Sequence, residues 1–387
     1  MRFMVTNFAY GTGPYLRTTE LAIAVNRERE TRGLERWGTI VPLVYGEEQR
    51  RVMTEEFHDY DRAHPGELFL DAPLGAILSS VFYGGDTAYA EALRIWVDTF
   101  AAASARAHAH LRGSLELETL SGEARTIANV DYAMEVSRAP RLRYGVAPIA
   151  NATFGYISEI LEHVLGEPAS RIAVDRTLVR EAMRIASAIE RDAAWHGLAE
   201  PSTFSYLPGR SRRYPVEEAI PPTIPSPSPD HAPMAEGIYV TVTGIPGLER
   251  LYREAETLGL KLYANNPGAV PKSERRLPQV IANPKIKFQF ARSGWGSVWL
   301  SQLSGTPLVV PDFDPADDPE IYFNNRCIEM LGLGIVWRGQ SLAEILTEAE
   351  RIRPGIQKRN RNLEQRFGTL DGNRYAAQRI IDKFPIL

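Results

Sequence analysis

Residues 277–326 read LPQVIANPKIKFQFARSGWGSVWLSQLSGTPLVVPDFDPADDPEIYFNNR, and this stretch decides the fold. A short apolar run, residues 286–290, ends in RSGWGS at residues 292–297. An amphipathic helical pattern follows, and GTP at residues 305–307 then leads into a second apolar run, residues 308–310. Strand, glycine turn, helix, turn and strand in this order predict a βαβ unit of a parallel sheet.

In such a unit the glycine turn lies where a strand ends and a helix begins. Small residues at this point let backbone N–H groups approach a ligand closely, and the helix N-terminus carries about half a positive charge, so it favours phosphate. We therefore expect Ser293, Gly294, Gly296 and Ser297 to bind phosphate through their backbone. The alternative is that the glycines only allow a tight turn, and both roles can hold together.

The same stretch resembles the donor-binding half of GT-B glycosyltransferases, which use nucleotide sugars and include natural-product and glycolipid transferases. In that family a Pro-Gln precedes a short strand, and His-x-Gly-Trp-x-Ser, Gly-x-Pro and Asp-Gln-x-x-Asn-Ala-Arg follow. The matching residues here, at nearly the same spacing, are PQ at 278–279, GWGS at 294–297, GTP at 305–307 and NNR at 324–326. The resemblance implies an α/β fold of two Rossmann-like domains facing each other across a cleft, with C-terminal helices that cross back to the N-terminal domain.

Three positions depart from the family pattern. The family's phosphate-binding His falls on Arg292, its ribose-binding Glu falls on Leu300, and the Gln of Asp-Gln falls on Ile321. A guanidinium at Arg292 suits a diphosphate. Its alternative role is to cap the end of a strand or to form an ion pair with Asp312 or Asp314.

The remaining donor-side residues are implied by the resemblance alone. Gln279 is the expected partner of the nucleobase, and Arg276 stands where the family often has a stacking aromatic residue. Glu320 and Asn324 are expected on the sugar side, and Gly244 ends the first strand of the donor domain beside the phosphates. A solvated acidic loop is the alternative for the region around Glu320.

The chain opens with a second unit of the same kind. An apolar run at residues 1–9 is followed by Gly11-Thr12-Gly13 and a helical pattern over residues 15–32. No Gly-x-Gly-x-x-Gly fingerprint is completed, so a dinucleotide-binding dehydrogenase is a distant alternative. In the resembled family this loop faces the acceptor and the donor phosphates, so we expect its three residues to bind substrate.

A Pro-rich stretch divides the chain, because residues 214–233 hold seven prolines and no apolar periodicity. We predict an acceptor-binding domain over residues 1–210, a linker over 211–235, a nucleotide-sugar-binding domain over 236–365 and a terminal helical segment over 366–387 that packs back on the first domain. Strands are expected at residues 39–45, 67–71, 76–83, 126–136, 144–149, 237–243, 261–264 and 335–337, and helices at 47–60, 87–111, 156–165, 175–195, 248–258, 342–353 and twice within 356–384.

The catalytic base is not fixed by the pattern. Inverting GT-B enzymes place a His or Asp at the end of the first glycine loop to accept the acceptor proton. Pro14 occupies that place here and has no titratable group. Asp86, after a glycine pair, is the favoured candidate over His58, Asp59 and His64, and a simple helix N-cap is its alternative role.

Composition limits the partners and the compartment. The chain has 387 residues, 44% of them hydrophobic, with a net charge of −4, which predicts two soluble domains with no general attraction to nucleic acid. A single cysteine, Cys327, and no run of about 18 apolar residues predict a cytoplasmic protein with at most peripheral membrane contact. No metal-binding motif is present in the sequence, and no cofactor is expected besides the nucleotide-sugar substrate.

We therefore interpret the chain as a metal-independent hexosyltransferase-like glycosyltransferase that moves a sugar from a nucleotide-sugar to an unidentified acceptor. The leaving phosphate would be stabilised by Arg292 and by helix N-termini. A nucleotide-sugar epimerase and a non-catalytic homologue that binds nucleotide or a partner protein are the alternatives. The donor base and sugar, the acceptor, the stereochemical course and the oligomeric state stay open.

Overall fold

The computed structural model describes the whole chain apart from residues 10, 82–86, 168–173, 229, 243 and 385–387. The chain forms two compact units. Unit 1 comprises Met1–Glu200, Ser211–Thr223 and Asn373–Leu387, and unit 2 comprises Pro201–Arg210 and Ile224–Gly372. Each unit contains a mainly parallel sheet covered by helices, so the expected α/β fold with two Rossmann-like units is confirmed.

The sheet of unit 1 has the strand order β5-β4-β3-β2-β1-β6-β7-β8-β9. Strand β4 pairs antiparallel with both β3 and β5, and all other neighbouring strands are parallel. The strands are β1 (Phe3–Phe8), β2 (Gly38–Pro42), β3 (Leu68–Asp71), β4 (Leu115–Thr119), β5 (Ala124–Ile127), β6 (Tyr132–Arg138), β7 (Ile149–Thr153), β8 (Ala193–Ala199) and β9 (Glu217–Ile220).

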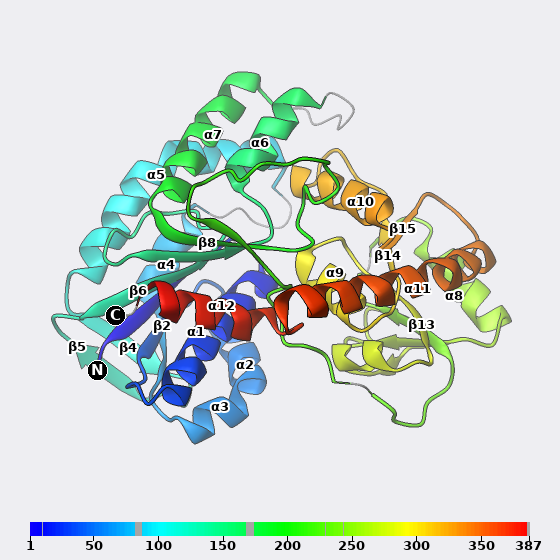
Figure 1. Cartoon of the computed structure of the whole chain (residues 1–387), viewed down its shortest axis with the longest axis horizontal. Coiled ribbons are helices and arrows are strands. Elements are labelled where there is room, and N and C mark those ends of the chain that lie inside the picture. Colours follow the sequence, from blue (N-terminus) through cyan, green and yellow to red (C-terminus); the bar gives the residue numbers. More distant parts are fainter. Residues whose placement is uncertain (10, 82–86, 168–173, 229, 243, 385–387) are drawn as a thin grey trace. The chain divides into compact units, whose positions relative to one another are not determined.

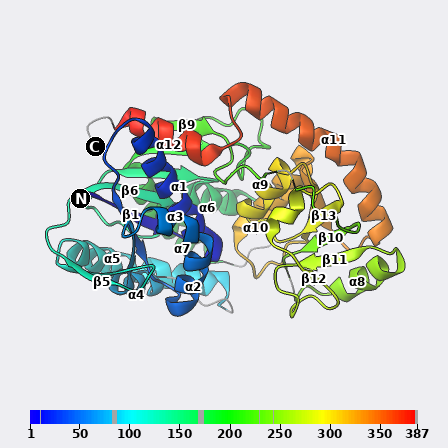
Figure 2. The same cartoon turned by 90° about the horizontal axis from the view of Figure 1, so that it is seen from below.

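The helices of unit 1 lie on both faces of this sheet, with α1 and α12 on one face and α5, α6 and α7 on the other (Figures 1 and 2). An ion pair of 2.7 Å between Arg32 and Asp382 joins α1 to α12, the helix that returns to unit 1 at the end of the chain. The helices are α1 (Thr12–Thr31), α2 (Gly46–Glu56), α3 (His58–Ala63), α4 (Ala72–Ser79), α5 (Tyr89–Leu111), α6 (Ile157–Gly166), α7 (Arg176–Arg191) and α12 (Gly372–Lys383).

Unit 2 has a fully parallel sheet with the order β12-β11-β10-β13-β14-β15. Its strands are β10 (Gly237–Val240), β11 (Lys261–Ala264), β12 (Glu274–Arg275), β13 (Ile286–Phe290), β14 (Leu308–Pro311) and β15 (Gly334–Trp337). Its helices are α8 (Leu248–Thr257), the 3₁₀ helix η2 (Pro278–Ala282), α9 (Trp295–Leu303), α10 (Pro319–Leu331) and α11 (Leu342–Phe367). The βαβ unit predicted from residues 277–326 is thus β13-α9-β14, and α10 continues it.

The centre of each sheet is buried because its parallel strands are covered on both faces. All six residues of β1 are buried, and so are all four of β10. Within unit 2, polar side chains of α11 cap the C-terminal ends of two other helices: Asn360 donates to the Gln302 carbonyl of α9 at 2.7 Å, and Arg359 donates to the Leu331 carbonyl of α10 at 3.1 Å. Among the described residues, no helix is long and apolar enough to cross a membrane.

The prediction of one strand in unit 1 is wrong. The sequence predicts a strand over residues 76–83, but residues 76–79 belong to α4, and residues 82–83 lie outside the described residues. The helix forms because the Asp71 side chain accepts the Leu74 N–H at 2.8 Å, and a proline in the first turn fits this start. The helix expected after Asp86 begins at Tyr89 with Ala88 as its N-cap, and Asp86 itself lies outside the described residues.

The middle of unit 1 also differs from expectation. Residues 126–136 form parts of two strands, β5 and β6, and the strand expected at residues 144–149 is β7, which starts at Ile149. Tyr144 instead packs in the core from a loop, where its hydroxyl donates to the Thr6 carbonyl at 3.3 Å. The helix expected over 175–195 ends at Arg191, because the following residues pair with β7 as β8.

Two further elements depart from the sequence reading. The Pro-rich stretch is not a linker throughout, since Glu217–Ile220 forms β9 and pairs with β8. The helix expected to stop before Pro354 continues to Phe367. Ile352 and Ile356, on either side of the proline, are both buried, so packing holds the helix together where one backbone hydrogen bond is missing.

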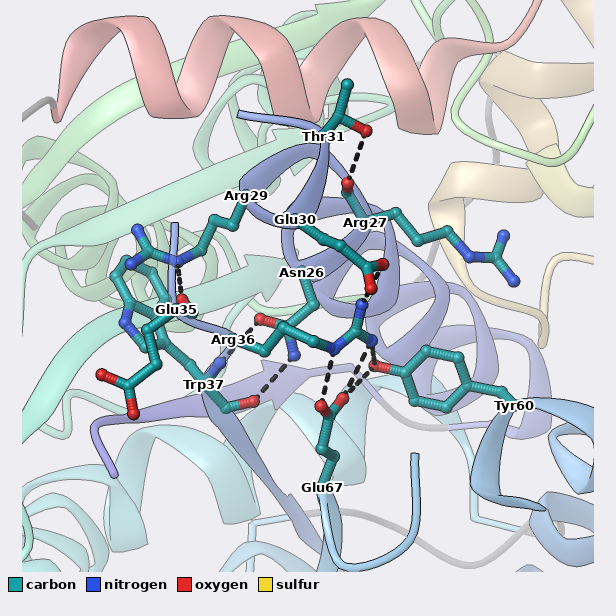
Figure 3. Close-up of polar contacts among 10 residues, drawn as sticks. All are labelled: Asn26, Arg27, Arg29, Glu30, Thr31, Glu35, Arg36, Trp37, Tyr60 and Glu67. Atoms are coloured by element: carbon teal, nitrogen blue, oxygen red, sulfur yellow. Dashed lines mark hydrogen bonds and ion pairs between the residues drawn. The ribbon is translucent and has the colours of Figure 1, made fainter. Parts of the chain in front are cut away.

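A polar network ties α1, α3 and the amino ends of β2 and β3 together (Figure 3). Arg36 forms two hydrogen bonds with the Glu67 carboxylate, at 2.6 and 2.9 Å, and further bonds with Glu30 and Tyr60, each at 2.8 Å. The Tyr60 hydroxyl also donates to Glu67 at 2.7 Å. Because Arg36 and Glu67 are largely buried, this bidentate pair has a strict geometry.

We predict that Arg36→Ala lowers the free energy of unfolding by about 2–4 kcal/mol, because it leaves the buried Glu67 carboxylate without its cation. Urea unfolding followed by circular dichroism measures this. The control is Arg51→Ala, which removes an exposed arginine with ion pairs to Glu48 and Glu55 and should change stability by less than about 1 kcal/mol. Equal effects of the two variants would contradict the prediction.

A buried carboxyl lies between the two central strands of unit 1. Glu135 of β6 accepts a hydrogen bond of 2.7 Å from the Asn7 side chain of β1, and its other oxygen, Oε2, is buried with no hydrogen-bond partner. Burial raises the pKa of Glu135 to about 8. The carboxyl is therefore protonated in the folded protein at neutral pH, whereas it is ionised in the unfolded chain.

Because the folded-state pKa of Glu135 is raised, its contribution to stability is present below about pH 4.5 and is lost as pH rises toward about 8. We predict that Glu135→Gln, which keeps a neutral side chain, makes the unfolding free energy at pH 8.5 larger by on the order of 2–4 kcal/mol and flatter with pH. Chemical unfolding at pH 5 and pH 8.5 tests this. A variant that is equally destabilised at both values would contradict it.

Candidate functional site

The candidate site of unit 2 lies where its strand order reverses. From the neighbours β10 and β13, the chain proceeds outward to β11 on one side and to β14 on the other. Ligands of open α/β sheets bind beyond the carboxyl ends of the strands at such a switch point. Val240 and Phe290 are paired at these ends, so the loops that follow them frame the site.

The loop after β13 is the glycine turn predicted from the sequence. Gly294 is the N-cap of α9, and its carbonyl accepts the N–H groups of Ser297 at 2.9 Å and Val298 at 3.1 Å. The N–H groups of Trp295 and Gly296 come before these bonds, in the first turn, where a helix offers no acceptor. A Cβ atom at Gly294 or Gly296 would meet nothing within 4 Å, so the start of α9 faces open space.

Arg292 precedes this turn with 53% of its side chain exposed, and it forms an ion pair of 2.8 Å with Asp317. The partner of Arg292 is therefore neither Asp312 nor Asp314, the two partners suggested by the sequence, but Asp317 of the same acidic loop. The loop leads into α10, where the Asp318 side chain accepts the Glu320 N–H at 2.9 Å. The starts of α9 and α10 therefore both lie beside Arg292.

Asn324 is completely buried, and its amide group is fully used inside the protein. Its Nδ2 donates to the Ser293 carbonyl and to Glu320 Oε1, each at 2.9 Å. Its Oδ1 accepts the indole N–H of Trp295 at 2.9 Å. Asn324 thus joins the glycine turn to the first turn of α10, and Glu320 is the more accessible of the two sugar-side candidates.

The loop after β10 contributes Gly244. This glycine is exposed with φ of +73°, and a Cβ atom there would meet nothing within 4 Å. The preceding Thr241 N–H donates to the Phe290 carbonyl at 2.9 Å, which holds the loop against the end of β13. Both glycine loops of unit 2 therefore begin at the switch point.

A pocket of about 590 Å³ lies farther along unit 2, at η2. Gln279, the expected partner of a nucleobase, lines it together with Arg276. The Arg276 guanidinium forms an ion pair of 2.6 Å with Glu274, which limits its freedom to stack on a ring. The other lining residues are Asp230, Ala232, Met234, Arg275, Leu277 and Val280. Leu300, at the position of the family's ribose-binding Glu, packs near Val280 in a hydrophobic cluster.

The first glycine loop belongs to unit 1 and lies at its own switch point, where β1 and β6 end. Gly11 has φ of +115° and is the N-cap of α1, and Thr12 and Gly13 begin the helix. The Gly11 N–H donates to the Tyr45 hydroxyl at 2.6 Å, so this amide is already satisfied. Pro14 lies in the first turn of α1, where the backbone N–H that proline lacks would have no acceptor within the helix.

Two buried polar residues, Arg138 and Thr203, were not predicted as site residues from the sequence. Arg138 ends β6 beside Phe8, is buried, and is followed by Ala139 with φ of +50°, a rare conformation for a non-glycine residue that often marks functional loops. The signal that was available is an arginine inside an apolar strand pattern. Thr203, which contacts Trp295, gave no signal because its role depends on contacts between distant segments.

Comparisons with known proteins identify the fold. No family model matches the sequence, and no curated protein matches it either. Among solved structures, UGT2 of Phytolacca americana, complexed with UDP-2fluoro-glucose and pterostilbene, aligns with a TM-score of 0.62 at 11% identity over 100% of both chains. The glycosyltransferase SnogD of Streptomyces nogalater aligns with a TM-score of 0.60 at 14% identity over 99% of both chains.

A third structure, a UDP-glucose:anthocyanidin 3-O-glucosyltransferase in complex with UDP, aligns with a TM-score of 0.60 at 12% identity, over 100% of this chain and 99% of that one. Matches of this length at such low identity show that the chain has the fold of these proteins. The expectation of a GT-B fold, made from the motif in residues 277–326, is confirmed.

The ion pair between Arg292 and Asp317 leads to a prediction about anion binding. Asp317→Asn should strengthen the binding of pyrophosphate by about 2- to 5-fold, because it frees Arg292 and removes a negative charge beside the glycine turn. Calorimetric titration at low salt measures the affinity. Asp312→Asn is the matched control, because it removes a charge from the same loop, and Asp312 pairs with Arg338 and not with Arg292. Weaker binding by Asp317→Asn would show instead that Asp317 orients Arg292.

Proposed function

We propose that this chain is a glycosyltransferase that moves a sugar from a nucleotide-sugar donor to an acceptor. The observation that carries the proposal is the open glycine turn at the switch point of unit 2, with the half-exposed guanidinium of Arg292 next to it. The full-length match to structures of UDP-sugar glycosyltransferases supports it. Unit 2 would bind the donor, and unit 1 would bind the acceptor.

Each part of the donor has a candidate contact in unit 2. The diphosphate would lie at the start of α9, bound by Arg292 and by the N–H groups of Trp295 and Gly296. The nucleobase would enter the pocket beside Gln279. Glu320, which accepts a hydrogen bond from the Asn324 side chain, would contact sugar hydroxyls through its carboxylate.

The reaction breaks the bond between the anomeric carbon and the phosphate oxygen, and the nucleoside diphosphate leaves with the bonding electrons. An acceptor atom forms the new bond to the anomeric carbon and gives up its proton. Arg292 and the helix N-terminus stabilise the negative charge that develops on the leaving phosphate. These groups supply positive charge of their own, so we propose that the chemistry proceeds without a metal ion.

The acceptor proton requires a base in unit 1. Pro14 cannot provide it, and Asp86 stays the candidate from the sequence, although it lies outside the described residues. The loop Gly11, Thr12 and Gly13 would contact substrate near the start of α1. The Tyr45 hydroxyl, which binds the Gly11 N–H, would fix the shape of that loop.

The deciding experiment is calorimetric binding of UDP, GDP, ADP, dTDP and CMP to the wild-type chain, Arg292→Ala and Arg351→Ala. We expect one nucleoside diphosphate to bind, and Arg292→Ala to weaken it by about 1.5–3 kcal/mol, as expected for loss of a charged hydrogen bond. Arg351 is an exposed arginine of α11 paired with Glu348, so Arg351→Ala should bind like the wild type.

Turnover then separates the alternatives. The nucleotide-sugar with the base found above is incubated with and without a panel of hydroxyl-bearing acceptors. Both nucleotide release and the configuration of the sugar in the remaining nucleotide-sugar are measured. Release that depends on an acceptor supports the transferase. Conversion of the donor without an acceptor supports an epimerase, and binding without any conversion supports a non-catalytic homologue. If no nucleotide binds at all, the proposal fails.

A further inference from the structure

The connection between β8 and β9 leaves unit 1 and returns to it. β8 ends at Ala199, residues 201–210 belong to unit 2, and the chain re-enters unit 1 at Ser211. We call residues 201–210 the strap. Its first four residues are all buried, so the first part of the strap packs within unit 2, whereas Pro208 and Gly209 are exposed.

Side chains of α9 and α10 hold the strap at several points. The Trp299 indole N–H donates to the Pro201 carbonyl at 2.9 Å, and Cys327 Sγ donates to the Ser202 carbonyl at 3.2 Å. The rings of Phe204 and Phe323 pack with their centroids 5.3 Å apart. The strap therefore has a fixed position against the two helices that begin at the candidate donor site.

Thr203 makes the contact that lies closest to the glycine turn. The indole N–H of Trp295 is shared between Thr203 Oγ1 at 3.0 Å and Asn324 Oδ1 at 2.9 Å. Trp295 is the first residue of α9, so its indole position and its backbone N–H are fixed together. Thr203 and Asn324 are fully buried and Trp295 is 3% exposed, and hydrogen bonds in such surroundings are strong and well directed.

Asn324 extends this contact into the turn itself. Its Nδ2 donates to the Ser293 carbonyl, one residue before the N-cap of α9, and also to Glu320. A continuous chain of hydrogen bonds therefore runs from Thr203 through Trp295 and Asn324 to the backbone of the glycine turn. A shift at either end changes the direction of the first N–H groups of α9.

We propose that Thr203 is a positioning residue for the donor diphosphate: through Trp295 and Asn324 it holds the glycine turn in the conformation that binds phosphate. The inference rests on the proposed function of the turn. N–H groups that already point toward the phosphate need no rearrangement when the ligand binds. Loosening the turn therefore lowers the affinity for phosphate groups. The nucleobase pocket at Gln279 uses other residues, and its affinity for a base should not change.

The test compares a ligand with phosphates and one without. UDP and uridine are titrated against the wild type, Thr203→Val and Thr203→Ser. Thr203→Val keeps the side-chain shape but removes the hydroxyl. It should lower the affinity for UDP by about 3- to 10-fold, as expected for loss of a buried hydrogen bond, and the affinity for uridine by less than about 2-fold. Thr203→Ser keeps the hydroxyl and should bind both ligands like the wild type.

Two further variants exclude a general effect of the strap. Ser205→Ala removes a hydroxyl that accepts the Ser202 N–H at 2.7 Å within the strap, away from the Trp295 contact, so the ratio of the two affinities should stay unchanged. Trp295→Phe removes the shared N–H, so Thr203→Val should change the ratio of the two affinities less in that background than in the wild type.

The outcomes separate the two proposals. If the wild type binds no nucleotide of the panel above, the proposed function of this site fails, and the role of Thr203 fails with it. If the wild type binds a nucleoside diphosphate with another base, that diphosphate and its nucleoside replace UDP and uridine in the test. If the wild type binds UDP but Thr203→Val leaves UDP binding unchanged, or weakens UDP and uridine equally, only the positioning role is overturned. Thermal unfolding of each variant is recorded to show that the measured protein is folded.

Discussion

The fully buried carboxamide of Asn324 is the interaction on which the candidate donor site depends. It uses both of its N–H groups and its oxygen to join the carbonyl of Ser293, the carboxylate of Glu320 and the indole of Trp295. A carboxamide is one of the few side chains that can donate and accept at the same time. Removing it would take one hydrogen-bond partner each from the Ser293 carbonyl, the Glu320 carboxylate and the Trp295 indole, which is costly in a dry interior.

This carboxamide acts within a constraint set by the parallel sheet. Each helix that follows a strand begins at the carboxyl edge, so positive helix ends gather there. In unit 2 the C-terminal ends of α9 and α10 are capped by Asn360 and Arg359 of α11. Their N-terminal ends lie at the switch point beside Arg292. The fold satisfies one end of these helices internally and leaves the start of α9 open to a ligand.

Unit 1 uses buried polar groups in a different way. The His196 ring donates from Nε2 to the Glu190 carbonyl at 2.8 Å, so its Nδ1 is the acceptor for the Asn151 amide at 3.1 Å. Burial lowers the pKa of His196 to about 4, so the ring is neutral and keeps this tautomer at pH 7. Contacts of this kind, like the pair of Arg36 and Glu67, fix strands and helices to each other below the carboxyl edge. They carry no sign of catalytic chemistry.

The sequence by itself determined the βαβ unit of residues 286–310, because strand, glycine turn and helix are local patterns set by apolar spacing and by small residues. It also determined that Gly294 and Gly296 lie at a helix start beside Arg292. Only the tertiary structure decided that residues 72–79 are helical, that Glu217–Ile220 completes a sheet, and that Asp317 pairs with Arg292. These outcomes depend on partners distant in the chain, and a short apolar segment has no local pattern that distinguishes a buried helix from a strand. The bond between Thr203 and Trp295 spans 92 residues, and no spacing rule in a single sequence can indicate it.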